Sequence, residues 1–310
     1  MMTAEELNGH IDDGSINEVI RIAEARQIKY LSRIADEVTA KSRLRLVLVT
    51  GASAAGKTTT AKRICTQLMV NGCSAAMHLS TDDYFVGDER NPRDENGNLD
   101  YEHVECVDIS RLASDINALL RGETVPRRRF DFVKHEPFYT AEQVALPESG
   151  MIVLEGIHAL NPRLTEGIDD EMKFRVFIEP RPEIDVFGGF TPSPADARFL
   201  RRMVRDNLFR KRNPSDTVRM WPSVRAGEAK WIDPFRGNAD AVFNSYLVYE
   251  LAALKPYVGG LLERARRELG EDRYVVGLIR LLEMVKAISP DAIPGDSILR
   301  ETIGGSQLEY

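Results

Sequence analysis

The chain has 310 residues, of which 43% are hydrophobic and 29% are charged, and its formal net charge is −7. This composition is ordinary for a soluble globular protein of one large domain or two modest ones. An acidic chain is not expected to bind nucleic acid, because a basic surface supplies most of that affinity. No apolar stretch approaches the roughly 18 residues needed to span a bilayer.

The cysteines, Cys65, Cys73 and Cys106, have neither the spacing of metal ligands nor the even number of a disulfide framework. The N-terminus has no apolar run that could serve as a signal peptide. We therefore expect a cytoplasmic protein whose partner is a small-molecule substrate, not nucleic acid or membrane. The sequence leaves open whether the chain forms a homo-oligomer.

Residues 1–43 are predicted to form an N-terminal helical segment. Apolar residues from Ser15 to about Ala40 recur near one face of a helix. Ser15 and Glu18 have the spacing of a capping box at its start. We expect this helix to pack on the domain that follows, and the alternative is a separate partner-binding helix.

One large domain is predicted for residues 44–248. Apolar strand-like segments alternate with helical patterns here, which indicates an α/β fold of three layers with a mostly parallel, doubly wound sheet. The expected strands are 44–49, 75–79, 151–154, 174–178 and 241–243, and the expected helices are 57–70 and 109–120. In such sheets, ligands bind outside the carboxyl ends of the strands. Helices at 249–268 and 273–287 and an irregular tail are predicted to form a C-terminal extension over 249–310.

Residues 51–58 match the phosphate-loop pattern G-x-x-x-x-G-K-[ST], between a predicted strand and a predicted helix. Glycines let successive N–H groups point inward, and the following helix directs its positive end to the same place. We expect Lys57 to reach the β- and γ-phosphates of ATP and the Thr58 hydroxyl to join a Mg²⁺ shell. The predicted nucleotide-binding residues are Gly51, Ala52, Ser53, Ala54, Ala55, Gly56, Lys57, Thr58 and Thr59, with Arg202 from a helix described below.

Two carboxylates follow predicted strands. Asp82 comes after the second strand, where it could accept a proton from an attacking hydroxyl or hold Mg²⁺. Glu155 follows the third strand, at the position of the acidic residue that helps hold the metal in phosphate-loop enzymes. Each could instead be a solvated loop acid. Both together beside a phosphate loop favour a catalytic and metal site.

Ser193, Pro194 and Asp196 have the pattern of a helix start. Four cations share one face of this helix at spacing i, i+3, i+4 and i+7, namely Arg198, Arg201, Arg202 and Arg205. Because a multivalent anion would relieve their repulsion, we predict a helical lid over about residues 193–215 that closes on the triphosphate and excludes water. The alternative is a basic face that is solvated or paired with acids elsewhere in the chain.

Seven segments occur in order along the chain: GASAAGKTT, STDDYF, LDYE, RRRFDFVKH, VLEGIHAL, DARFLRRMVRD and SILRETIGGS. Together they resemble the uridine kinase and phosphoribulokinase family of P-loop kinases, and most closely the longer bacterial uridine-kinase-like nucleoside kinases. The resemblance implies that Asp82 is the catalytic base and that Thr58, Asp82 and Glu155 serve Mg²⁺. It also implies that the catalytic residues include Lys57 and the lid arginines Arg198, Arg201 and Arg205.

The resemblance further implies an acceptor site. In uridine kinases an aspartate after the second strand holds the ribose hydroxyls, and Asp100 is its expected match. The expected base pocket contains Phe130, Phe132 and His135, and Tyr84 is expected to bind substrate as well. Phe130 stands where pyrimidine kinases carry a tyrosine, so pyrimidine specificity does not transfer. From the residues alone, the rings of Phe130, Phe132 and Tyr101 either stack on a base, with His135 as a hydrogen-bond donor to it, or belong to the core.

The sequence therefore predicts an ATP- and Mg²⁺-dependent small-molecule kinase that transfers the γ-phosphate to a hydroxyl. The first choice of acceptor is the 5′-hydroxyl of a nucleoside. Arginines 127–129 would instead suit a sugar phosphate, and another hydroxy metabolite is also open. A third alternative, from another functional class, is an ATP-binding regulatory protein without phosphotransfer.

Overall fold

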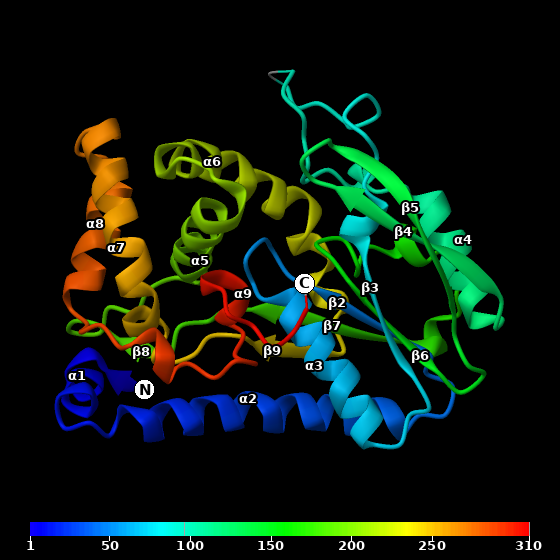
Figure 1. Cartoon of the computed structure of the whole chain (residues 1–310), viewed down its shortest axis with the longest axis horizontal. Coiled ribbons are helices and arrows are strands. Elements are labelled where there is room, and N and C mark those ends of the chain that lie inside the picture. Colours follow the sequence, from blue (N-terminus) through cyan, green and yellow to red (C-terminus); the bar gives the residue numbers. More distant parts are fainter. Residues whose placement is uncertain (96, 310) are drawn as a thin grey trace.

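A five-stranded parallel sheet forms the centre of the molecule (Figure 1). The computed structural model describes residues 1–95 and 97–309. In spatial order the strands are β3 (Ala76–Ser80), β6 (Met151–Glu155), β2 (Leu46–Thr50), β7 (Lys173–Glu179) and β9 (Ala241–Asn244). Every neighbouring pair in this sheet is parallel. The strands predicted from the sequence are confirmed, each within about two residues of its expected bounds.

The carboxyl ends of three strands meet at one edge of this sheet. Ser80 of β3 is in register with Glu155 of β6, and Glu155 is in register with Val49 of β2. Both β2 and β6 are fully buried. Helices cover both faces of a parallel sheet, so its central strands are continuous apolar runs, and polar groups appear only where those runs end.

Helices pack on both faces of the sheet. On one face, α2 (Ile16–Thr39) and α3 (Lys57–Val70) place Ile34 and Ile64 in one core with Val47 of β2. On the other face, α4 (Ile109–Leu120) places Ile116 in a second core with Leu154 of β6. The predicted three-layer α/β fold is confirmed, and the N-terminal helix packs on the domain that follows it.

The predicted capping box at Ser15 and Glu18 is wrong. The Ser15 side chain does not cap α2, and its hydroxyl donates to Asp13 instead. A capping box lies earlier, at Thr3 and Glu6, where the short helix α1 (Ala4–Asp12) begins. Ser15 and Glu18 have the spacing of a capping box, but the Ser15 hydroxyl bonds to Asp13 in the turn before α2 and does not reach the helix amides.

A helical region stands beside the sheet and contains the predicted lid. Its helices are α5 (Pro194–Arg210), α6 (Pro214–Trp231), α7 (Glu250–Leu269) and α8 (Arg273–Glu283). The predicted start of α5 is confirmed by a capping box between Ser193 and Asp196. Phe199 of α5 shares a core with Leu7 of α1 and Leu254 of α7. This core crosses the expected boundaries near residues 43 and 248, and the three-part division of the chain remains a prediction.

The sequence prediction lacks several elements. They are an antiparallel hairpin of β4 (Thr124–Asp131) and β5 (Glu136–Ala145), the helix α6, the short helix α9 (Arg300–Ile303), and a parallel pair of β1 (Met2–Thr3) with β8 (Ile184–Asp185). Short 3₁₀ helices lie at 81–84, 104–106, 162–165, 170–172, 233–238 and 290–292. Within the described residues, no helix is both long and apolar enough to cross a membrane.

Candidate active site

The phosphate loop lies between β2 and α3, and its backbone conformation depends on small residues. A Cβ on Gly51 would lie 2.4 Å from the carbonyl oxygen of Ile178, so a larger residue does not fit there. Gly56 has a left-handed φ of 87°, which glycine adopts without strain. Hydrogen bonding within α3 begins with the Thr60 N–H, which donates to the Gly56 carbonyl at 3.1 Å. The amides of residues 57–59 have no acceptor inside the helix, so its N-terminal end can bind phosphate.

Glu155 forms a polar centre beside the loop. Its Oε1 accepts hydrogen bonds from the Thr58 hydroxyl at 3.1 Å and from the Ser80 hydroxyl at 2.8 Å. The residue is only 3% exposed. Burial, and then the charge of Asp82, raises the pKa of Glu155 to about 7, while the Lys57 ammonium acts in the opposite direction. A bound cation would stabilise the charged form of this carboxylate.

The oxygen donors at this centre fit Mg²⁺. Across residues 1–95 and 97–309, no group of three or more His, Cys, Asp or Glu side chains could hold a metal ion by itself. Magnesium usually takes only one or two protein carboxylates and completes its octahedron with water and substrate phosphates. A hydroxyl from Thr58 and a carboxylate from Glu155 therefore suit a metal that arrives with a nucleotide.

Asp82 lies in a 3₁₀ turn, Thr81–Tyr84, directly after β3. The Ser80 hydroxyl caps this turn by accepting the Asp82 N–H at 3.2 Å. The turn can approach β6 closely because residue 156 is glycine: a Cβ there would lie 1.8 Å from the Thr81 hydroxyl oxygen. The structure thus brings the two predicted carboxylates, Asp82 and Glu155, to the same end of the sheet as the phosphate loop.

Two of the predicted lid arginines contact Ser53 of the phosphate loop from α5. Arg202 Nη1 donates to the Ser53 hydroxyl at 2.8 Å, and Arg198 Nη1 donates to the Ser53 carbonyl at 3.4 Å. Arg198 also forms an ion pair with Glu228 of α6 at 2.6 Å. Arg198 is 2% exposed and Arg202 is 6% exposed. A solvated basic face is therefore excluded for both, and the pairing of these arginines with acids is observed.

Asp206 lies among four arginines at the C-terminal end of α5 and just after it. Its buried carboxylate is within 3.0 to 3.5 Å of four guanidinium groups, those of Arg202, Arg205, Arg210 and Arg212. The charge of Arg205, together with burial, lowers the pKa of Arg210 to about 10. One carboxylate does not neutralise four cations. The lid therefore keeps an excess of positive charge that a polyphosphate could neutralise.

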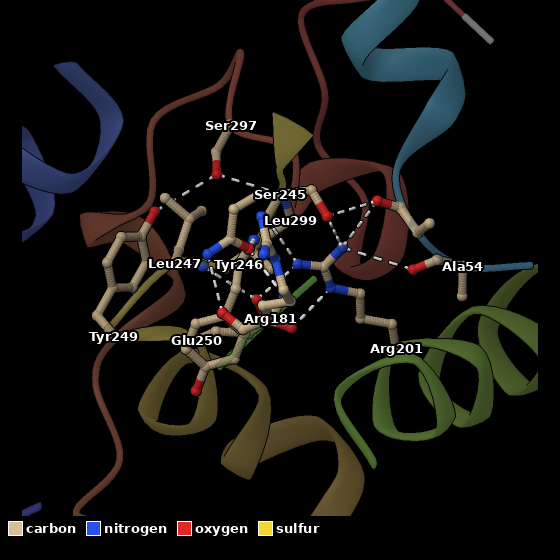
Figure 2. Close-up of polar contacts among 12 residues, drawn as sticks. Ala54, Arg181, Arg201, Ser245, Tyr246, Leu247, Tyr249, Glu250, Ser297 and Leu299 are labelled. Atoms are coloured by element: carbon tan, nitrogen blue, oxygen red, sulfur yellow. Dashed lines mark hydrogen bonds and ion pairs between the residues drawn. The ribbon is translucent and has the colours of Figure 1, made fainter. Parts of the chain in front are cut away.

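The prediction for Arg201 is corrected by its surroundings. Figure 2 shows its guanidinium enclosed by Glu250, Ser245 and the loop backbone. It makes two contacts with the Glu250 carboxylate, both at 2.6 Å, and the two residues are 2% and 0% exposed. Its Nη1 also donates to the carbonyl oxygens of Ala54 and Ala55 at 3.5 and 3.3 Å. The guanidinium donors of Arg201 are taken up by Glu250, Ser245 and loop carbonyl oxygens, so Arg201 supports the loop backbone instead of facing the transferred phosphoryl group.

Two predicted substrate-binding residues, Tyr84 and Phe130, lie in the core. Tyr84 is 4% exposed, and its hydroxyl donates to Asp115 of α4 at 3.0 Å. This contact corrects the prediction that Tyr84 binds substrate. Phe130 is 7% exposed and meets Phe85 edge-on, with ring centroids 5.6 Å apart. The core alternative is therefore correct for Phe130.

Phe132 and His135 remain accessible on the β4–β5 hairpin. Phe132 is 53% exposed. The Nδ1 atom of His135 lies 3.1 Å from the Tyr101 hydroxyl and 3.3 Å from a carboxylate oxygen of Asp88. These contacts bring the hairpin next to the loop that carries Asp100. A base pocket at Phe132 and His135 remains a prediction.

Glu102, which is not among the residues predicted from the sequence, lies near Arg202 and Lys57 at the phosphate site. Its Oε2 is buried and has no hydrogen-bond partner. Burial raises the pKa of Glu102, and the nearby charges of Arg202 and Lys57 oppose this rise. Asp100, the predicted ribose ligand, instead accepts the Glu102 N–H at 3.0 Å and shapes the turn. The segment LDYE offers two carboxylates two residues apart, and the buried, unpaired Oε2 of Glu102 distinguishes that residue from Asp100.

The phosphate loop, both strand-end carboxylates and the arginine helix all fall within residues 46–252, which match the model of the Phosphoribulokinase / Uridine kinase family. The chain belongs to this family. Uridine kinase from Deinococcus deserti is 30% identical over 195 residues, which are 63% of this chain and 84% of that protein. Uridine kinase from Halobacterium salinarum is 29% identical over 195 residues, which are 63% of this chain and 77% of that protein.

Solved structures also resemble the chain. That of a possible uridine kinase from Bacillus stearothermophilus has a TM-score of 0.45 and 20% identity, and covers 71% of this chain and 98% of that one. A D-glycerate 3-kinase from Cryptococcus neoformans has a TM-score of 0.42 and 11% identity, and covers 67% and 89%. Family membership makes the protein a P-loop kinase, a phosphotransferase with an alcohol group as acceptor. The alternative of a regulatory protein without phosphotransfer is set aside.

Proposed function

We propose that this kinase transfers the γ-phosphate of Mg²⁺-bound ATP to the 5′-hydroxyl of a nucleoside. The observation that carries the proposal is the Glu102 carboxylate near Lys57 and Arg202, whose Oε2 is buried without a hydrogen-bond partner. A buried carboxylate requires hydrogen-bond donors, and ribose offers two adjacent hydroxyls. Relatives named uridine kinase support the same acceptor class. The exposed ring of Phe132 offers a surface on which a planar base can stack.

The residues on the donor side have distinct roles in this proposal. The amides of residues 57–59 and the Lys57 ammonium hold the triphosphate. Thr58 and Glu155 would hold Mg²⁺, which neutralises charge on the β- and γ-phosphate oxygens when it is bound. Asp82 accepts the proton of the attacking hydroxyl as the new P–O bond forms.

The lid completes the proposed site from the other side. Arg198, Arg202 and Arg205 supply positive charge for the transferring phosphoryl group, which carries charge on its equatorial oxygens. Helix α6 passes so close to the acceptor loop that a Cβ on Gly227 would lie 2.5 Å from the Glu102 Cβ. The lid therefore covers the proposed acceptor position and helps to exclude water, which separates phosphotransfer from ATP hydrolysis.

The surroundings of residues 127–129 do not favour a sugar phosphate as acceptor. Arg127 forms an ion pair with Glu142 at 2.7 Å, and Arg129 forms one with Asp83 at 2.8 Å. Arg128 donates to the Phe85 carbonyl at 3.0 Å and lies 3.4 Å from Asp108. An anionic acceptor would have to break these contacts, because each of the three guanidinium groups already has an acceptor.

A substrate panel tests the proposal. Purified protein with Mg²⁺ and ATP is assayed for ATP consumption with nucleosides, sugar phosphates and polyols, and products are identified by mass spectrometry. We expect a nucleoside 5′-monophosphate. Activity confined to phosphorylated sugars would remove the nucleoside proposal.

Replacing Glu102 with glutamine should raise the KM for the nucleoside by about 10- to 100-fold, because a hydrogen bond to a charged group contributes about 1.5–3 kcal/mol. The KM for ATP should change little. The matched control is Asp100→Asn, which removes a charge two residues away, and we expect a smaller effect on the nucleoside KM. Steady-state kinetics with each substrate varied in turn measures the KM for the nucleoside and the KM for ATP in each variant. A larger effect of Asp100→Asn would return the ribose-binding role to Asp100.

A further inference from the structure

The C-terminal tail brings a carboxylate to the phosphate site. Figure 1 shows α9, in red, beside α5 and the start of α3. Oε2 of Glu301 accepts hydrogen bonds from the Thr59 hydroxyl at 2.7 Å and from the Thr59 N–H at 3.3 Å. Thr59 follows directly after Lys57 and Thr58 in the phosphate loop. An anionic group of this chain therefore already contacts the helix end at which the nucleotide phosphates are expected to bind.

The position of Thr59 in α3 indicates which phosphate is involved. Its amide is the last of those in the first turn, because the Thr60 N–H already donates to Gly56 within the helix. In phosphate loops the lysine reaches the β- and γ-phosphates, while the backbone amides hold the α- and β-phosphates. The amide farthest along the helix from the loop is therefore the natural donor to the α-phosphate. In this structure the Glu301 carboxylate accepts from that amide.

The backbone around Glu301 is firmly held. Arg300 donates hydrogen bonds to four carbonyl groups of the tail, those of Pro290, Ile293, Pro294 and Gly304. Ile298 packs on the phosphate loop, since a Cβ on Gly56 would lie 2.4 Å from the Ile298 Cδ1. Leu299 is 0% exposed. The Glu301 side chain is only half-buried, so rotation of this side chain is the smallest movement that clears the Thr59 amide.

The charge of Glu301 also reaches the catalytic centre. Burial is the largest cause of the raised pKa of Glu155, and the charge of Glu301 adds to it. Burial lowers the pKa of Arg201, but the charges of Glu250 and then Glu301 raise it. A phosphate group that approached Thr59 would meet this negative charge as well as the occupied amide. Both effects oppose nucleotide binding until the carboxylate moves away.

We propose that Glu301 sets the affinity for the phosphate donor by occupying the α-phosphate position, from which the nucleotide displaces it. The proposal rests on the ATP site proposed above and adds a competing group supplied by the chain itself. The apparent affinity is then the intrinsic affinity multiplied by the fraction of molecules in which the carboxylate has swung away.

The test is the dissociation constant of Mg²⁺ with a non-hydrolysable β,γ-imido analogue of ATP, measured by titration calorimetry on the full chain. Glu301→Gln keeps the shape of the side chain and removes its charge. We expect it to bind the analogue about two- to fivefold more tightly, the range that a carboxylate at a helix N-terminus contributes. Glu301→Ala, which removes the whole group, should tighten binding as well and serves as a second variant.

Asp296→Asn is the matched control. It removes the same charge from the same tail, but Asp296 is half-exposed and lies 3.8 Å from Arg63, one turn further along α3 than Thr59. Its dissociation constant should equal that of the unmodified protein. Binding that is unchanged or weaker in both Glu301 variants, with circular dichroism spectra that match the unmodified protein, would overturn the proposal.

The substrate panel separates this result from the proposed function. Tighter binding in the Glu301 variants without any phosphorylated acceptor would remove the nucleoside kinase proposal and leave the competing carboxylate in place. Nucleoside phosphorylation with unchanged analogue binding in the variants would support the nucleoside kinase proposal and remove the competing carboxylate. If neither the unmodified protein nor Glu301→Gln binds the analogue, both proposals fail.

Discussion

Asp82→Asn should lower turnover by about 10²-fold or more, the low end of what loss of a general base costs. Asparagine has the shape of aspartate but cannot take a proton from the acceptor hydroxyl at neutral pH. The backbone of the turn should persist, because its cap is the Ser80 hydroxyl and not the Asp82 side chain. We therefore expect nearly unchanged affinity for ATP. Initial rates with saturating substrates give kcat, and calorimetric titration gives the affinity.

Asp83→Asn is the matched control for this prediction. Asp83 carries the same charge one residue further along, but it forms an ion pair with Arg129 of the hairpin at 2.8 Å. Its replacement should change turnover far less than replacement of Asp82. Equal rates for the unmodified enzyme and Asp82→Asn would refute Asp82 as the base.

Arg201→Ala should destabilise the protein by about 3–5 kcal/mol, because it leaves the fully buried Glu250 carboxylate without a counter-ion. It also removes the donor to the Ala54 and Ala55 carbonyls of the phosphate loop. Urea unfolding followed by circular dichroism measures the change in the free energy of unfolding. We expect a reduced affinity for ATP in the variant, since the loop loses its support.

Arg205→Ala is the control on the same helix. Asp206 keeps three other cations when Arg205 is removed, so no buried charge is left unpaired. We expect turnover to fall with a much smaller loss of stability. If Arg201→Ala lost less than about 1 kcal/mol of stability, an ordinary effect for a single substitution, and turnover nevertheless collapsed, the catalytic role first predicted for Arg201 would return.

Local sequence patterns predicted the elements that bury apolar surface. The strands of the central sheet are continuous apolar runs, and α2 and α3 have the helical repeat of apolar residues. The β4–β5 hairpin was missed because β5 is largely exposed on both faces, so apolar and polar residues do not alternate clearly along it. Helix α6 was missed for a different reason, because it carries Pro222 in its interior. A proline usually argues against a helix interior.

The candidate site was predictable where it is contiguous or follows from sheet topology. The phosphate loop is one segment, and Asp82 and Glu155 both end strands of the same sheet. Tertiary packing decided the remaining roles. Arg201 and Arg202 are neighbours on one helix face, yet Arg201 has Glu250 as its counter-ion and Arg202 contacts Ser53. The partner of Arg201 lies 49 residues away, and helix spacing alone cannot show which acid it meets.

The ion pair between α5 and α7 also limits how this enzyme can be shortened. The family match ends at residue 252, which suggests that a minimal catalytic fragment could be cut near there. A break at residue 252 would keep Glu250 but strip most apolar residues of α7 from the shared core, and a break at residue 248 would also remove Glu250 and leave Arg201 without its counter-ion. Comparison with shorter relatives makes the last sixty or so residues look dispensable, but the packing makes them part of the catalytic scaffold.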